Sequence, residues 1–499
     1  MTDKILFWLD GDVIQFCLAY YLQKKYPGDL FAITDITDRP KKFFKEQKFV
    51  KFAKNWFYHD HIKTTKNADL KYLENFQKKY GIDLSELANH DRILNKYNEY
   101  YNFSEEEINS ILEHECKFFE MVLDNVNPNY FITGETALQP NHLFSEICKR
   151  KGIKVLMLNH ANWKTFCYIS EARHKIDGFI KLSNDEYQSC NFEDLQNILE
   201  ESKVSKYHAE FSDKIKNSKL ALVNAAIRFL LTSNTNIKTH YTYFGRSKFK
   251  VLYKGIQDPI KKKQRERFIE SNLLKNLQSS KPFVYMPLHQ EPERSLLIAA
   301  PKFSDQIRTI KEVVKNLPPN YELYVKEHPT QGPSRGWREI SFYEEIIKIK
   351  NVKLFHPNFD SRILLKNCKL LISVGGTSSF EATFFDKPSI IFADLGYAII
   401  PSIKKLNSYE ELNEGIRDSL KTNVNPNHVY NYIKTLEENS FDFDIMKISA
   451  NYHNWFYMNG NTVDVVIENN KMKKFLLDNK TEFEKLSSEF IKKINLLKN

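Results

Sequence analysis

Cysteine and glycine are both scarce in this sequence, and each scarcity excludes a class of structure. The six cysteines form no C-x-x-C pair, and none is grouped with histidine at zinc-ligand spacing. They are Cys17, Cys116, Cys148, Cys167, Cys190 and Cys368. A disulfide framework or a structural zinc site is therefore not expected, and a reducing compartment fits best. Glycine contributes only 15 residues, so a pair of adjacent glycines indicates a local requirement of the backbone.

Long apolar runs are also missing. No window approaches the ~18 consecutive apolar residues of a membrane span, and the closest one, residues 220–231, contains Asn224 and Arg228. The amino-terminal segment passes straight into a strand-like run at residues 4–9, without the basic and apolar regions of a signal peptide. We therefore expect a cytoplasmic protein, with peripheral contact to the inner face of the membrane left open.

Apolar and basic residues are abundant. Hydrophobic residues make up 42% of the 499 positions and aromatic residues 14%, which suffices for packed domains and argues against disorder. A chain of this length exceeds a single core, so two domains are expected. The formal net charge of +10 favours anionic partners, although a lysine-rich solvated surface explains it equally well.

Two segments of the chain alternate between apolar strands and amphipathic helices. In the first, strand-like runs lie at 4–9, 30–34, 129–133 and 153–158. In the second, they lie at 282–288, 321–326, 352–355, 369–374 and 388–392. Short strand–helix–strand connections are typical of parallel sheets. The sequence therefore predicts two α/β units whose sheets face each other across a cleft.

The predicted domain boundaries follow this alternation. Residues 1–184 are predicted to form the first α/β domain, with a helical insertion at about 40–125, and residues 276–435 to form the second. Residues 185–275 read as a helical, basic linker region, and residues 436–499 as carboxy-terminal helices.

The linker region contains a markedly basic stretch at residues 246–267. It carries nine Lys or Arg and only two acidic residues, with Phe249, Leu252, Tyr253 and Ile256 interleaved. This pattern predicts weak binding to an anionic membrane surface. A solvated helix face or an interdomain linker would give the same pattern.

One apolar strand ends at Lys326, Glu327, His328 and Pro329. In an extended chain Lys326 and His328 project to the same side. Together they would neutralise a diphosphate, and His328 would donate to an oxygen of the leaving group. The alternative is a surface loop in which Pro329 only ends the strand.

A second apolar strand opens into a glycine pair and a run of hydroxyls. The segment consists of Gly375, Gly376, Thr377, Ser378 and Ser379. A strand that leads into the N-terminus of a helix leaves backbone N–H groups for a phosphate, and glycine would let bare backbone approach it. Glu381 lies three residues after Ser378, so it fits either a helix capping box or a carboxylate that holds ribose hydroxyls.

Polar residues at the strand ends of the first domain are candidates for the catalytic base, because ligands of open parallel sheets bind beyond the carboxyl ends of the strands. Glu135 is the first candidate, since a carboxylate half-buried in a closing cleft has a raised pKa. Asp10 and Asp12 are the second and His160 a further one, while helix capping is the alternative for the carboxylates. No metal site is expected at residues 59–61 (His-Asp-His), because neighbours in sequence rarely converge on one ion.

Several motifs occur in a recognisable order along the second domain. They are Pro287–Glu293, Leu323–Pro329, Phe342-Tyr343, Gly375–Ala382 and Asp386–Pro388. This order resembles the capsule polysaccharide biosynthesis proteins, a group similar to the Kdo-transferase and sialyltransferase-like glycosyltransferases of the GT-B type. The resemblance extends over about 280–400 and, more loosely, over 128–160, where Thr133–Thr136 looks like the strand end of the family's first domain.

The resemblance implies a GT-B-like fold of two facing Rossmann-like domains, the first for the acceptor and the second for a nucleotide-sugar donor, without an obligatory metal or cofactor. It implies that His328 contacts the donor phosphate and that the turn Thr377–Ser379 helps to hold it. Lys326, Gly375, Gly376 and Glu381 complete the predicted binding set.

We therefore predict a metal-independent glycosyltransferase of surface or capsule-like polysaccharide biosynthesis. The donor is a nucleotide sugar, with a CMP-linked acidic sugar as one candidate, and the acceptor is an oligosaccharide or lipid-linked glycan. A phosphotransferase that uses a CDP-linked polyol, and a non-catalytic glycan-binding or assembly protein of the same fold, are the alternatives. Nucleic acid is not an expected partner.

Overall fold

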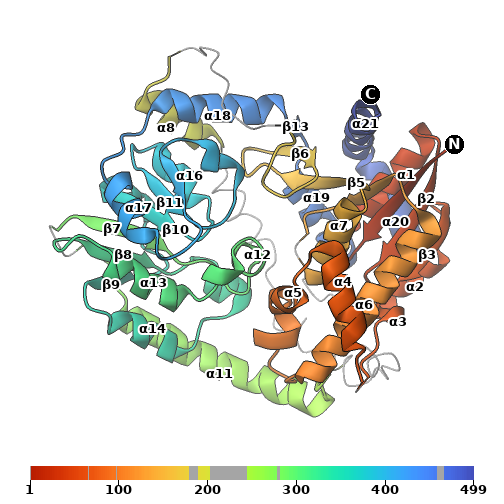
Figure 1. The fold of residues 1–499 in the computed structure, drawn as a ribbon, viewed down its shortest axis with the longest axis horizontal. Coiled ribbons are helices and arrows are strands. Elements are labelled where there is room, and N and C mark those ends of the chain that lie inside the picture. The colour runs from red at the N-terminus through yellow and green to blue at the C-terminus, as the bar shows by residue number, and fades with distance from the viewer. Residues whose placement is uncertain are drawn as a thin grey trace. The chain divides into compact units, whose positions relative to one another are not determined.

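The computed structural model describes residues 2–36, 38–65, 67–96, 98–136, 138–178, 189–202, 227, 244–277, 281–457 and 466–498. The chain divides into two compact units (Figure 1). Unit 1 comprises Met1–Asp177, Val204–Val251 and Asn439–Asn499, and unit 2 comprises Gly178–Lys203 and Leu252–Glu438.

Unit 1 is built on a seven-stranded sheet in the order β13-β6-β5-β4-β1-β2-β3. Its strands are β1 (Asp3–Leu9), β2 (Gly28–Thr34), β3 (Phe52–Phe57), β4 (Tyr130–Thr133), β5 (Lys154–His160), β6 (Phe166–Ser170) and β13 (Phe441–Asp442). Strands β1 to β5 are parallel, whereas β6 is antiparallel to β5 and to β13.

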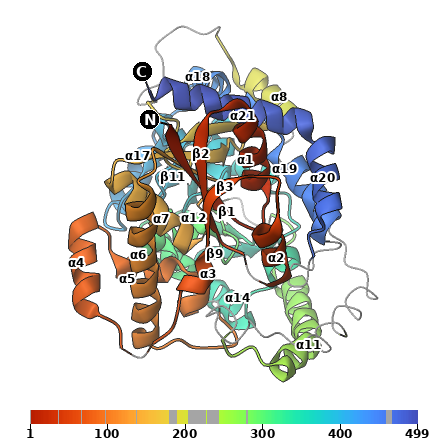
Figure 2. The ribbon, with the colours of Figure 1, turned by 90° about the vertical axis from the view of Figure 1, so that its right-hand side faces the viewer.

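Helices cover both faces of this sheet (Figure 2). They are α1 (Ile14–Lys25), α2 (Asp38–Glu46), α3 (Tyr58–His61), α4 (Leu70–Tyr80), α5 (Leu84–His90), α6 (Glu105–Val126), α7 (Gln139–Arg150), α19 (Ile445–Tyr452), α20 (Asn469–Asp478) and α21 (Lys480–Leu496). Successive residues of β1 point to opposite faces. Ile5 and Phe7 pack with α1, α20 and α21, while Leu6 and Trp8 pack with α4 to α7. Burial on both faces explains why β1 reads as a continuous apolar run.

The carboxy-terminal helices are part of unit 1. The Tyr21 hydroxyl of α1 donates to the carbonyl of Leu476 at 2.5 Å, and its ring stacks on Phe483 of α21. Lys498 forms an ion pair with Asp3 of β1 at 2.6 Å. This differs from the sequence-based division, in which residues 436–499 formed a separate region.

Unit 2 has a six-stranded, fully parallel sheet in the order β12-β11-β10-β7-β8-β9. The strands are β7 (Phe283–Pro287), β8 (Glu322–Lys326), β9 (Val352–Phe355), β10 (Leu370–Ser373), β11 (Ser389–Ile391) and β12 (Ile403–Lys405). The helices are α8 (Phe192–Ser202), α11 (Lys248–Asn272), α12 (Arg294–Leu297), α13 (Gln306–Lys315), α14 (Ile340–Ile347), α15 (Ser361–Asn367), α16 (Ser378–Thr383), α17 (Leu412–Ser419) and α18 (Pro426–Glu438). The ring of Tyr324 packs between Phe283 at 4.0 Å and Phe355 at 5.0 Å and so joins three adjacent strands.

The predicted α/β class is confirmed, with two Rossmann-like units that each contain a parallel sheet. The helical insertion at 40–125 is wrong in one place, because it contains strand β3. The centre of β3, Ala-Lys-Asn, is polar, and β3 is an edge strand, so the apolar signal of a buried strand is absent there. Part of the predicted linker 185–275 lies outside the described residues, while α8 and most of α11 belong to unit 2.

Among the residues that the structure describes, no helix is both long enough and apolar enough to span a membrane.

Candidate functional site

The carboxyl ends of β10, β7 and β8 lie side by side at the middle of the unit 2 sheet. The chain enters this sheet at β7, adds β8 and β9 on one side, and then adds β10, β11 and β12 on the other. This reversal is a topological switch point, where open parallel sheets bind ligands. His289 follows β7, His328 follows β8 and Gly375 follows β10, so the sheet brings these three strand ends together.

His289 connects the loop after β7 to the glycine turn after β10. Its Nε2 accepts a hydrogen bond from the N–H of Gly375 at 3.1 Å and lies 3.1 Å from Ser373 Oγ, which in turn accepts from the N–H of Gly376 at 3.0 Å. Because Nε2 accepts, a neutral imidazole carries its proton on Nδ1. That atom lies 3.7 Å from a carboxylate oxygen of Glu293.

Glu293 is held in its ionised form. Burial alone would raise its pKa, but the hydrogen bond and charge of His289, the hydroxyl of Ser295 and the charge of His328 together lower the pKa of Glu293 to about 2. The switch point therefore contains two imidazoles close to one fixed negative charge.

The glycine pair has a packing role that differs from the predicted one. A Cβ on Gly375 would lie 2.6 Å from Ala393 Cβ, and one on Gly376 would lie 3.3 Å from the His289 ring. The two N–H groups are already used by His289 and Ser373, so the expectation that they bind a phosphate is not supported. The turn is glycine because it packs closely against its neighbours.

The predicted capping box between Ser378 and Glu381 is also not formed. The N-cap residue of α16 is Thr377, without a side-chain cap, and its hydroxyl donates to a carboxylate oxygen of Glu381 at 3.2 Å. Burial raises the pKa of Glu381. Thr377 is exposed, Ser378 and Glu381 are half-buried, and Ser379 is buried.

His328 has one nitrogen fixed by its own loop. Its Nδ1 accepts from the N–H of Thr330 at 3.3 Å and lies 2.9 Å from the Thr330 hydroxyl. A neutral His328 therefore carries its proton on Nε2. Burial lowers the pKa of His328 to about 4, against the opposing charges of Glu293 and Glu327, so the ring is a neutral hydrogen-bond donor at physiological pH.

The ammonium group of Lys326 is hydrogen-bonded to backbone carbonyls instead. Lys326 is 4% exposed, and its Nζ donates to the carbonyl of Pro357 at 2.8 Å and to that of Glu327 at 3.4 Å. Burial lowers the pKa of Lys326 to about 8. Lys326 fixes the loop after β9, so the expectation that it joins His328 on one diphosphate is not supported.

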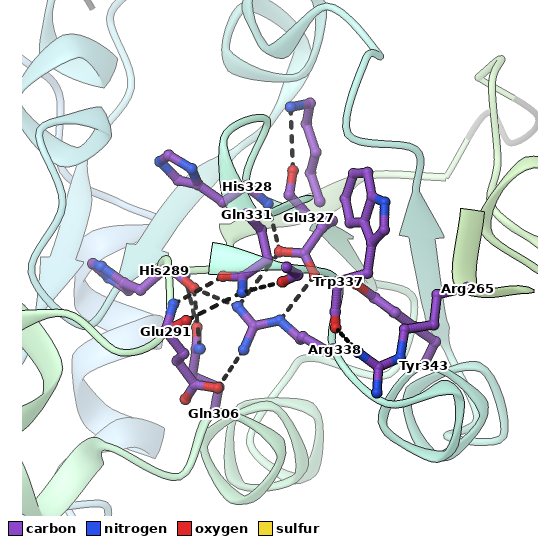
Figure 3. A network of polar contacts seen from close by, with 12 residues as sticks. Arg265, His289, Glu291, Gln306, Glu327, His328, Gln331, Trp337, Arg338 and Tyr343 are labelled. Atoms are coloured by element: carbon purple, nitrogen blue, oxygen red, sulfur yellow. Dashed lines mark hydrogen bonds and ion pairs between the residues drawn. The ribbon is translucent and has the colours of Figure 1, made fainter. Parts of the chain in front are cut away.

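A buried polar network holds the loops that carry His289 and His328 (Figure 3). Glu327 is fully buried and accepts from Arg338 Nε at 2.8 Å, from the Tyr343 hydroxyl at 2.9 Å and from the N–H of His328 at 2.7 Å. Arg338 also pairs with Glu291 and donates to the carbonyl of His289 at 2.5 Å. One guanidinium therefore joins the loops after β7 and β8.

Two glutamines complete this network. Gln331 Oε1 accepts from the N–H of Glu291 at 2.8 Å, and its Nε2 donates to the carbonyl of Glu291 at 3.1 Å. Gln306 Oε1 accepts from the N–H of His289 at 2.7 Å. Side chains thus fix the backbone on both sides of the site, which orients the imidazoles before any ligand binds.

Most of this network could not be predicted from the sequence. Glu291 and Tyr343 lie in motifs that carry the resemblance, whereas Arg338, Gln306 and Gln331 lie outside all of those motifs. No local spacing marks them, because their partners lie up to 49 residues away.

In unit 1, Asp10 and Asp12 follow β1 and interact with each other. Asp10 Oδ1 accepts from the N–H of Asp12 at 2.9 Å. Burial, the charge of Asp12 and the charge of Asp35 raise the pKa of Asp10 to about 7, and burial also raises that of Asp12. Helix α1 has Val13 as its N-cap, without a side-chain cap, so the capping interpretation of the two aspartates is wrong.

Glu135, the first candidate for the base, is engaged at both oxygens. It forms an ion pair with Arg173 at 2.8 Å and accepts from the N–H of His160 at 3.1 Å. Helix α7 begins at Gln139, with no side-chain cap, so Glu135 does not cap it either. His160 Nδ1 accepts from the N–H of Asn162 at 3.2 Å.

Residues 59–61 have separate partners. His59 pairs with Asp35 at 2.7 Å, Asp60 pairs with Lys41, and the His61 ring stacks on Phe118 at 4.4 Å. In the described part of the chain, no three His, Cys, Asp or Glu side chains are grouped so that they could hold a metal ion.

Residues 186–404 match the family model described as capsule polysaccharide biosynthesis protein. None of the curated proteins matches the chain.

Several solved structures are similar to it at low scores. The beta Kdo 2,4 transferase KpsC of Thermosulfurimonas dismutans has 12% identity over 61% of this chain and 79% of its own, with a TM-score of 0.30. The UDP-GlcNAc 2-epimerase of Methanocaldococcus jannaschii, in complex with UDP-GlcNAc and UDP, has 11% identity over 88% of this chain and 100% of its own, with a TM-score of 0.25. The UDP-GlcNAc 2-epimerase of Neisseria meningitidis, bound to UDP-GlcNAc, has 13% identity, coverages of 87% and 99%, and a TM-score of 0.23.

The family match contains every residue of the unit 2 site described above. The resemblance expected from the motifs at about 280–400 is thus confirmed: residues 186–404 are similar to the capsule polysaccharide biosynthesis proteins.

Proposed function

We propose that this chain is a glycosyltransferase of capsule-like polysaccharide biosynthesis, and that its nucleotide-sugar donor binds beyond the carboxyl ends of β7, β8 and β10. The observation that carries the proposal is the state of His328. Its Nδ1 is occupied by Thr330, its Nε2 carries the proton, and among the described residues none accepts from Nε2. The neutral donor thus stands at the switch point, ready for a phosphate oxygen.

The reaction needs few groups from unit 2. An acceptor hydroxyl oxygen attacks the anomeric carbon, the bond from that carbon to the phosphate oxygen breaks, and the nucleotide leaves with the bonding electrons. His328 Nε2–H donates to the phosphate as negative charge develops, which stabilises the transition state more than the ground state. The network around Arg338 keeps His289 and His328 in place, and the hydroxyl of Ser378 contributes a further donor.

The proton of the acceptor hydroxyl passes to a base, and among the candidate carboxylates of unit 1 the Asp10–Asp12 pair is better suited to that role than Glu135. A pKa of about 7 at Asp10 is close to the value at which a general base works best near neutral pH. Glu135 is bound by Arg173, so accepting a proton would break its ion pair.

The binding test is a thermal-shift screen with CMP, CDP, UDP, GDP and their sugars. A donor present at ~100 times its dissociation constant stabilises the protein by about 2.7 kcal/mol. His328→Ala should lower kcat by about 10²- to 10³-fold, the usual loss when one such donor is removed. The matched control is His428→Ala, because His428 is a half-buried histidine of α18 in the same unit. A screen without any nucleotide response, or a His328→Ala variant with the turnover of the control, contradicts the proposal.

Two alternatives predict different products. A phosphotransferase that uses a CDP-linked polyol would form a phosphodiester, so mass analysis of the product separates it from sugar transfer. A non-catalytic glycan-binding protein would bind a nucleotide without turnover. No product would then form with either the unaltered protein or Asp10→Asn.

A further inference from the structure

Helix α11 is light green in Figures 1 and 2, and it exposes a line of large apolar side chains. Phe249, Tyr253, Ile256 and Ile260 are 87%, 62%, 70% and 58% exposed. They are spaced by four, three and four residues, so they lie on one face of the helix. Single exposed apolar residues are ordinary, whereas an aligned set marks an interaction surface. We call these four residues the α11 stripe.

The opposite face of α11 is attached to unit 2. Arg265 donates to the carbonyl of Trp337 at 2.8 Å and pairs with Glu339, and Ile269 is 1% exposed. Arg265 lies nine residues after Ile256, which is a half-integral number of helical turns. The helix is therefore held by one side while the α11 stripe faces away from that side.

Cationic side chains surround the stripe. Lys263 and Arg267 continue its line at the next spacings of three and four residues, and Lys250 and Lys261 flank one edge; all four are exposed. The whole helix carries eight Lys or Arg and three acidic residues. The partner of this surface should therefore be both anionic and apolar beneath its charges.

We propose that α11 docks on the surface of an anionic lipid bilayer, parallel to the plane of the membrane. The α11 stripe enters the boundary between headgroups and acyl chains, while the lysine stems extend sideways so that their ammonium groups meet lipid phosphates. A second copy of the chain fits poorly, because it would bring the same cations to the contact and because four side chains fall well short of the ~800 Å² per partner of a stable interface.

The proposal concerns residues outside the unit 2 site and stands independently of the catalytic proposal. It would place the protein where a lipid-linked glycan is presented.

The test is co-sedimentation of the whole chain with vesicles of phosphatidylcholine alone, and with phosphatidylglycerol at roughly a third of the lipid. We expect binding only to the anionic vesicles, and its loss at about 0.5 M salt. The combined substitution Tyr253→Ser, Ile256→Ser and Ile260→Ser should lower the partition coefficient by ~10-fold or more. Each of Lys250→Gln and Lys261→Gln should lower it about fivefold.

Matched controls come from other helices. Leu70, Leu477 and Leu496 are 62%, 60% and 71% exposed on α4, α20 and α21, so their combined substitution by Ser removes similar apolar surface. Lys78 and Lys315 are 71% and 77% exposed, and their change to Gln removes equal charge. These variants should bind as the unaltered protein does.

Several outcomes overturn the proposal. They are equal binding to neutral vesicles, an α11 stripe variant that binds like the unaltered chain, and control variants that lose as much binding as the α11 variants. A concentration-dependent dimer in sedimentation velocity that the stripe variant dissolves would assign the surface to a second copy. Should the triple variant lose its fold, Ile256→Asp changes one exposed residue and must still abolish binding to anionic vesicles.

Discussion

Arg338 is the residue whose removal tests the site most directly. It is 8% exposed and bridges Glu327, which is fully buried, to Glu291 and to the carbonyl of His289. Arg338→Met keeps much of the volume and removes the charge, which leaves two carboxylates without their cation. Removing one partner of a buried ion pair costs about 3–5 kcal/mol, so we expect a loss of that size in the free energy of unfolding of unit 2.

The size of this effect is checked against two further variants. Glu327→Gln in the Arg338→Met background removes the stranded charge, and it should recover about 2–3 kcal/mol of the loss. Lys311 and Glu345 form a half-exposed ion pair at 2.7 Å in the same unit, and Lys311→Met should cost at most about 1 kcal/mol.

The assay must report on unit 2 alone. The chain has five tryptophans, and among them only Trp337 belongs to unit 2. Incorporation of 5-fluorotryptophan gives its ring a separate ¹⁹F signal, which the Trp337→Phe variant assigns, and urea titration of that signal follows unit 2. The reasoning is refuted if Arg338→Met costs no more than Lys311→Met, or if the added Glu327→Gln restores nothing.

Three further predictions follow from the strand ends. Lys326→Met should lower the free energy of unfolding by about 1–3 kcal/mol, because the Pro357 carbonyl loses its donor. The same variant should weaken nucleotide binding in isothermal titration far less than His328→Ala does; an equal loss of binding would mean that Lys326 does contact the phosphate. The Tm of Asp10→Asn relative to that of the unaltered protein should rise as pH increases from about 4 to about 7 and stay constant outside that window. The Asp10 carboxyl ionises near pH 4 in the unfolded chain but only at about pH 7 in the folded protein, so the unaltered protein loses stability between these values and the Asn variant does not; a difference that does not vary with pH would speak against the raised pKa. Gly375→Ala should cost about 1–3 kcal/mol in chemical denaturation because its Cβ would meet Ala393, whereas Gly255→Ala, in an open position of α11, should stabilise the protein by about 0.5–1 kcal/mol; similar effects of both changes would contradict the packing role of the turn.

The strand ends could be located from the sequence because parallel strands buried on both faces read as apolar runs that stop in polar groups. His328 was found in this way, and so were Asp10 and Gly375. Strand β3 was not found, since an edge strand needs no apolar centre and its Ala-Lys-Asn segment resembles the polar helical residues around it.

The partners of charged residues could not be predicted in the same way. Whether Lys326 reaches a ligand or a carbonyl depends on where the loop after β9 places Pro357, 31 residues further along the chain. Arg338 pairs with Glu291 across 47 residues, and the segment between them passes through α13 and β8 without a pattern that links the two. Local periodicity identifies helices and strands, whereas these contacts depend on how the loops are arranged in three dimensions.

The return of residues 439–499 to unit 1 has a consequence for synthesis of the chain on the ribosome. One face of the unit 1 sheet, with Ile5 and Phe7, is covered by Phe475, Phe483 and Phe490, which are translated after unit 2. The residues of unit 2 end at Glu438 and emerge earlier. We therefore expect the usual order of folding during translation, amino-terminal domain first, to be reversed, because one face of the first sheet stays uncovered until α20 and α21 emerge. Chaperone binding to nascent chains should accordingly concentrate on β1 and α1 and be released only after α21 has left the ribosome.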